Sequence, residues 1–261
     1  MAIYSHSKLS TFEQCPLKFN FRYIQKVEPD FKTTIEGFLG SKVHDTLEWV
    51  YNNKNRDFEL DDLIRHYGES WNNDFKEPIK IVKEGITAED YFNKGIKFLI
   101  NYYTKHHPFK DNTLETEKKV FVDLDDSGNY KLIGYIDRLV YDKNKNIFEI
   151  HDYKTGALKS QQDLDNDRQL ALYSIAIREN YSNIDDVHLI WHFLNHNKEM
   201  KSKRTIEQLK KLKEDIMELI RKIESTINFK PNKSILCKWC EFRSKCPEFS
   251  DNKIETQRRL L

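Results

Sequence analysis

The chain has 261 residues, which is enough for one large α/β domain or two small ones. Its 43 Lys and Arg residues nearly balance 42 Asp and Glu residues, and hydrophobic residues make up 38% of the chain. This composition is typical of a soluble globular protein and excludes collagen-like, mucin-like and largely disordered chains. The net charge of +1 neither favours nor excludes nucleic acid, because a binding groove needs only local positive charge.

The sequence shows no sign of membrane insertion or export. No stretch approaches the run of about 18 apolar residues that a membrane span needs. The first residues, MAIYSHSK, lack the basic and then apolar layout of a signal peptide. We therefore expect a cytoplasmic protein with no membrane partner.

The first part of the chain has the periodicity of helices. Apolar residues recur at helical spacing, and Pro16 interrupts the first of these patterns. The predicted helices cover residues 7–23, 36–51, 61–71 and 87–107.

The period then changes to that of β-strands, joined by polar turns. We predict strands at 114–124, 130–141, 147–153 and 187–195, and helices at 163–179 and 205–227. This order favours one α/β domain with a mixed sheet and a helical N-terminal insertion. The expected parts are an N-terminal segment, a helical region, a core with the sheet, and a long helix with a cysteine-rich tail, at 1–35, 36–110, 111–200 and 201–261.

The four cysteines divide as one plus three: Cys15, then Cys237, Cys240 and Cys246. Disulfides are rare in a reducing compartment, so the C-x2-C-x5-C spacing is more naturally a set of metal or iron–sulfur ligands. A zinc ribbon would supply two close pairs, whereas four thiolates also fit a [4Fe–4S] cluster. Zinc remains the alternative.

The strand at 147–153 ends in the sequence HDYKTG, within which Asp152 and Lys154 stand two residues apart. Side chains alternate along a strand, so these two point to the same face of the sheet. The carboxylate can hold a divalent metal while the ammonium polarises water or steadies phosphate charge. A solvated ion pair at a strand end is the ordinary explanation of the same pattern.

The preceding strand carries Asp137 between the apolar residues Ile136 and Leu139. Burial of an ionised carboxylate is costly unless it is paired or bound to a cation. A partner such as Arg138 would also explain this position.

Two pairs of residues stand four apart on predicted helices and therefore share a helical face. Gly40 and His44 form the first pair, and Gln169 and Tyr173 form the second. An amide and a phenol can bind phosphate or base, and the phenol can stack on a base. Each pair alone is also compatible with ordinary helix packing.

Taken in chain order, these motifs resemble RecB-type nucleases of the PD-(D/E)XK superfamily. The resemblance runs from Ser7 to Pro247, and the one-plus-three cysteines resemble the iron–sulfur subgroup that includes AddB nuclease domains and CRISPR-adaptation nucleases. The matching segments are SKLSTFEQCP (7–16), G-x-x-x-H (Gly40, His44), G-x-I-D (Gly134, Asp137), D-Y-K-T-G (152–156) and Q-x-x-x-Y (Gln169, Tyr173).

The resemblance implies a restriction-endonuclease-like α/β core with a mixed central sheet flanked by helices. It also implies that the N- and C-terminal segments are joined at a [4Fe–4S] cluster held by the four cysteines. His44, Asp137, Asp152 and the backbone carbonyl of Tyr153 would bind Mg²⁺ or Mn²⁺, with Lys154 helping to activate the attacking water. Gln169 and Tyr173 would hold the DNA near the scissile phosphate. Glu117 or Glu115 would add a further acidic group; the sequence does not decide between them, and Glu117 is taken as the candidate.

We accordingly expect a metal-dependent deoxyribonuclease, an exonuclease that acts on single-stranded DNA or DNA ends in repair or recombination. The alternatives are a CRISPR-adaptation nuclease that processes spacer precursors and a catalytically silent DNA-binding or scaffold subunit. No G-x-x-x-x-G-K-[ST] loop is present, so a helicase activity would have to come from a separate partner protein. The oligomeric state stays open.

Overall fold

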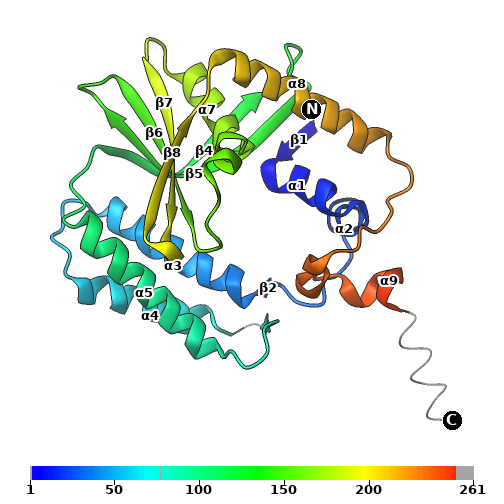
Figure 1. Ribbon diagram of the computed structural model, residues 1–261, viewed down its shortest axis with the longest axis horizontal. Helices are drawn as coiled ribbons and strands as arrows, with labels where there is room; N and C mark the ends of the chain where they lie inside the picture. The colour runs from blue at the N-terminus through cyan, green and yellow to red at the C-terminus, as the bar shows by residue number, and fades with distance from the viewer. Residues whose placement is uncertain (1, 77, 251–261) are drawn as a thin grey trace.

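The computed structural model describes residues 2–76 and 78–250, and its centre is a six-stranded mixed sheet (Figure 1). The strand order is β1-β5-β6-β7-β8, and β4 pairs with β5 as well. The β1–β5 and β6–β7 pairs are parallel, and the other pairs are antiparallel. The strands are β1 (Ala2–Ser5), β4 (Thr113–Asp123), β5 (Tyr130–Asp142), β6 (Ile147–Lys154), β7 (Asp186–Phe193) and β8 (Lys198–Lys203).

Helices flank the sheet, as predicted. One layer consists of α3 (Ile35–Asn52), α4 (Leu60–Asp74) and α5 (Ala88–His106), which share one hydrophobic core (Figure 1). The helices α7 (Arg168–Asn180) and α8 (Ile206–Ser225) pack with the inner strands around a second core. Within the described residues, none of the helices is both long and apolar enough to cross a membrane.

The two ends of the described chain lie side by side. The N-terminal helices α1 (His6–Gln14), α2 (Pro16–Phe19) and η1 (Asn20–Ile24) meet the tail that carries η3 (Ile235–Trp239), η4 (Arg243–Lys245) and α9 (Pro247–Ser250) (Figure 1). The backbone N–H of Asp30 donates to the Glu241 carbonyl at 2.7 Å, and that of Leu17 donates to the Lys230 carbonyl at 3.3 Å. These contacts close the chain on itself and bring the first cysteine to the other three.

Two predicted helices are each divided into shorter helices. The one at 7–23 breaks at Cys15, whose backbone is extended, and Pro16 then starts α2. The one at 163–179 divides into α6 (Gln161–Asp165) and α7, because Asp167 caps α7 by accepting from the Gln169 N–H. This cap fixes Gln169 in the first turn of α7.

Four strands of the described chain were not predicted from the sequence. The strand β1 has four residues, and β8 is an edge strand of sequence KEMKSK, too polar to be distinguished from a loop. The two-residue strands β2 (Thr33–Thr34) and β3 (Ile79–Lys80) form a separate small sheet beside α3.

Candidate active site

The candidate site lies where β5 and β6 separate. Their pairing ends at Arg138 and His151, while β6 continues along β7 as far as Lys154. Beyond this point the Tyr153 N–H donates to Asp137 Oδ2 at 2.8 Å, and the Tyr153 carbonyl lies 2.8 Å from His44 Nε2. Side chains of the predicted site therefore satisfy the backbone groups that the diverging strand exposes.

His44 and Asp137 form the centre of the site. A carbonyl only accepts, so the proton of the His44 ring is on Nε2 in the hydrogen bond to Tyr153. In the neutral ring, Nδ1 then presents a lone pair to Asp137 Oδ2, 3.4 Å away. Two acceptors that face each other leave room for a proton or a cation between them.

Glu117 completes a three-residue group. Ligand atoms of His44, Glu117 and Asp137 all lie within 4.8 Å of one another. The backbone of Glu117 is left-handed, with φ of 44°, which is a costly conformation for a residue with a Cβ and is concentrated at functional sites. Glu115 instead pairs with Lys118 at the surface, so the structure favours Glu117 over Glu115.

The electrostatics of this group fit a cation. Burial, together with the nearby Asp152 carboxylate, raises the pKa of Asp137 from 3.8 to about 7, against the opposing effect of His44. Burial also raises the pKa of Glu117. Asp152 Oδ2 is buried and has the Lys154 ammonium 2.8 Å away, with no further hydrogen-bond donor among the described residues. Nitrogen and carboxylate ligands with this excess of negative charge suit a divalent ion such as Mn²⁺ or Mg²⁺.

Asp152 and Lys154 extend from β6 on the side of α7. Lys154 Nζ lies 2.9 and 2.8 Å from the two Asp152 oxygens, and it donates to Gln169 Oε1 at 3.1 Å. Burial opposes the charge on Lys154, but Asp152 and Asp137 outweigh it and raise the pKa of this ammonium. The Asp152 carboxylate pairs with Lys154 and lies outside the group of ligand atoms around His44, so it would have to turn toward that group to share an ion.

Tyr173, predicted to bind substrate together with Gln169, is largely buried. The residue is 5% exposed, and its ring lies against Gly134 of β5 in the core. The role of Tyr173 in holding DNA near the scissile phosphate stays a prediction, and a ring this deeply buried would take part through its hydroxyl group. Gln169, which is half-buried, holds Lys154 in place.

Gly134→Ala is expected to destabilise the fold by about 1–3 kcal/mol, the usual cost of overpacking a core. An added Cβ would lie 2.0 Å from Tyr173 Cε1, so the ring would have to move. Urea unfolding measures the effect, and Gly156→Ala is the control, since nothing lies within 4 Å of its added Cβ. Equal stability of the Gly134 variant and wild type would contradict this packing.

One residue that borders the site, His6, was not predicted from the sequence. His6, the first residue of α1, lies close enough to Lys154 and Arg168 for their charges to act on it. Burial lowers the pKa of His6 to about 4, so its ring is neutral. The helix α1, which contains the SKLSTF motif, therefore borders the site through His6, the residue just before this motif.

The four cysteines meet at one pocket between α2 and the C-terminal tail. All four are free thiols of intermediate burial, and together they line a cavity of about 40 Å³. The backbone N–H groups of Asn232 and Ser234 donate to the sulfurs of Cys15 and Cys237, each at 3.4 Å. In the described chain, no three cysteine sulfurs lie within 4.8 Å of one another.

The fold and the site together define an α/β nuclease core in which two diverging strands carry acidic residues and a lysine. The chain belongs to the PD-(D/E)XK nuclease superfamily, whose family model matches residues 3–247. This match confirms the predicted superfamily.

Two solved structures are similar to this chain at low sequence identity. A "Putative exonuclease" from Eubacterium rectale is 13% identical, with a TM-score of 0.52 over 90% of this chain and 86% of that chain. The structure of SSO0001 is 16% identical and covers 93% of this chain and 95% of that one, with a TM-score of 0.39. No curated protein matches the chain. The first of these similarities supports the fold.

Proposed function

We propose that this protein is a metal-dependent deoxyribonuclease, an exonuclease that acts on single-stranded DNA or DNA ends in repair or recombination. The observation that carries the proposal is the group of His44, Glu117 and Asp137, whose ligand atoms lie within 4.8 Å of one another. The Asp152–Lys154 pair lies beside this group on the adjoining strand. Membership of a nuclease superfamily that generally uses divalent metals supports the same chemistry.

The side chains have distinct roles in this proposal. His44, Glu117, Asp137 and Asp152, with the Tyr153 carbonyl, would hold Mg²⁺ or Mn²⁺. When bound, such an ion lowers the pKa of water and neutralises charge on the phosphate. Lys154 is an ammonium, so it acts as a hydrogen-bond donor to water or to a phosphate oxygen and not as a base. Gln169 keeps this donor oriented.

Cleavage of end-labelled DNA tests the function. Single-stranded DNA, double-stranded DNA and RNA, each labelled at the 5′ or the 3′ end, are incubated with Mg²⁺, Mn²⁺ or EDTA. We expect cleavage of single-stranded DNA from an end, with metal only. Binding without cleavage under every condition would instead support the scaffold alternative, and preferential cleavage of spacer precursors would support the CRISPR-adaptation alternative.

The cysteine site supports the iron–sulfur subgroup. In a tetrahedral zinc site with Zn–S bonds of about 2.3 Å, the sulfurs are only about 3.8 Å apart. Among the described residues, no three of the cysteine sulfurs come within 4.8 Å of one another. The cavity of about 40 Å³ also exceeds the 10–15 Å³ or so that a single water needs. We therefore propose a [4Fe–4S] cluster over zinc.

Cys240→Ala is expected to lose the brown colour of the cluster and solubility together. The cluster would join Cys15 to the tail, and a cross-link over so long a loop constrains the unfolded chain by on the order of 5 kcal/mol. Visible absorption, iron content and the soluble fraction measure the effect. A colourless variant that is folded and fully active would contradict a structural role.

A further inference from the structure

A second group of ligands lies at the other side of the sheet from Asp152. His106 is the last residue of α5, His192 belongs to β7, and Glu199 belongs to β8. One ligand atom from each lies within 4.8 Å of the others. The helical layer and the β7–β8 hairpin therefore meet at two imidazoles and a carboxylate that the proposed nuclease site does not use.

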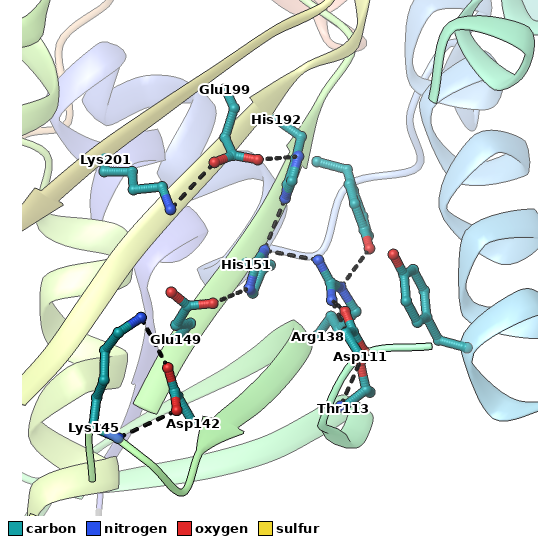
Figure 2. A network of polar contacts seen from close by, with 12 residues as sticks. Asp111, Thr113, Arg138, Asp142, Lys145, Glu149, His151, His192, Glu199 and Lys201 are labelled. Carbon is teal, nitrogen blue, oxygen red and sulfur yellow. Dashed lines mark hydrogen bonds and ion pairs between the residues drawn. The ribbon is translucent and has the colours of Figure 1, made fainter. Parts of the chain in front are cut away.

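A buried chain of hydrogen bonds determines which ring nitrogens of His151 and His192 carry a proton (Figure 2). Arg138, which is 2% exposed, donates from Nη2 to His151 Nδ1 at 2.8 Å. A guanidinium can only donate, so His151 Nδ1 is an acceptor. His192 Nε2 lies 2.8 Å from the same Nδ1 and must therefore be the donor in this second contact.

This order leaves His192 Nδ1 without a proton in the neutral ring. Nδ1 faces Glu199 Oε2 at 3.7 Å, and none of the described residues donates a hydrogen bond to it. Figure 2 shows Glu199 and His192 aimed at each other, with Lys201 3.4 Å from the other oxygen of Glu199. The lone pair of this largely buried ring thus faces a carboxylate, and a cation between the two groups would offset their repulsion.

A proton on His192 is the less favourable source of that charge. The side chain is 3% exposed, and Arg138 already places one cation in the network. Burial, then His151 and Arg138, lower the pKa of His192 well below its ordinary value. His106 is the third potential ligand of the group. Burial lowers its pKa to about 4, so its ring is neutral and can bind a metal ion.

We propose that His106, His192 and Glu199 bind a zinc ion, with water in the remaining position. Two imidazoles and one carboxylate are an established ligand type for zinc, and imidazole favours zinc over Mg²⁺. The Nε2–H of His192 bonded to His151 is the outer contact that orients a ligating histidine. The ion would fasten the end of α5 to the β7–β8 hairpin, behind the strand that carries Asp152.

The test uses Co²⁺ as a spectroscopic substitute for zinc in the full-length purified protein. Excess Mg²⁺ is present to occupy the oxygen-rich nuclease site. We expect one equivalent of Co²⁺ to give visible ligand-field bands of nitrogen and oxygen ligation, without the thiolate charge-transfer band that the cysteines would produce. His106→Gln and Glu199→Gln should each weaken this binding about tenfold or more.

Two matched variants serve as controls. Glu149→Gln removes a carboxylate of the same network that lies 3.4 Å from His151 and is not a ligand, and Asp137→Asn alters the nuclease site. Both should bind Co²⁺ as wild type does, and circular dichroism verifies that every variant is folded. Thiolate bands alone, or binding unchanged in both ligand variants, would overturn the proposal.

Discussion

Asp152→Asn is expected to reduce DNA cleavage by about 10³-fold or more, the order of effect when a charged group that stabilises a transition state is lost. The Asp152 carboxylate is 3% exposed and contributes the negative charge beside Asp137. Asparagine has nearly the same shape but carries no charge, so it weakens cation binding and leaves Lys154 without its ion-pair partner. Lys154→Gln should have a comparable effect, because it removes the ammonium that Gln169 orients toward water or a phosphate oxygen.

Steady-state cleavage of labelled single-stranded DNA at saturating Mn²⁺ measures both variants. Asp215→Asn is the matched control, since this aspartate is also paired with a lysine, Lys211, but lies exposed on α8. It should cleave at the wild-type rate. Full activity of Asp152→Asn, with the control also active, would remove Asp152 from the site.

Asp137→Asn is expected to stabilise the metal-free protein at pH 8, although it should inactivate the enzyme. The carboxyl of Asp137 titrates near pH 7 in the folded chain and at about 3.8 otherwise. The folded state therefore binds this proton more tightly, and the resulting stabilisation is present below about pH 4. It is lost as the pH rises from about 4 through 7, by on the order of 2–4 kcal/mol.

Urea unfolding in EDTA between pH 4 and 8 measures this effect. The free energy of unfolding of wild type, relative to Asp137→Asn, should fall with rising pH, because asparagine can still accept the Tyr153 N–H but carries no charge. Added Mn²⁺ should restore stability to wild type at pH 8 and not to the variant. A difference that stays constant across this pH range would contradict an uncompensated carboxylate at this position.

The predictions from the sequence agree best with the structure where the side-chain period of a helix or strand determines the feature. The two-residue period of β6 is enough to place Asp152 and Lys154 on one side of the sheet, where the structure brings them into contact. The mixed sheet and its flanking helices likewise follow from hydrophobic patterns and turns. The edge strand β8 was not predicted, because polar residues predominate on both of its faces and its sequence shows no clear hydrophobic alternation.

Other features of the site depend on tertiary structure. Glu115 and Glu117 are two apart on one strand. The structure distinguishes them, because Glu117 lies in the group with His44 and Asp137 whereas Glu115 pairs with Lys118. The spacing of Gln169 and Tyr173 predicts a shared helical face, but it carries no information on the bare strand surface at Gly134 that buries the ring. Arg138, the partner that the sequence offered for Asp137, instead pairs with Asp111, which precedes β4.

Anomalous diffraction from crystals soaked in Mn²⁺ tests the central claim most directly, because it locates the ion without reference to activity. We predict a peak within bonding distance of His44, Asp137 and Glu117, with Asp152 turned toward it. The peak should vanish in crystals of Asp137→Asn. Well-ordered density for these four side chains with no peak between them, at Mn²⁺ concentrations that support cleavage, would contradict the proposed site.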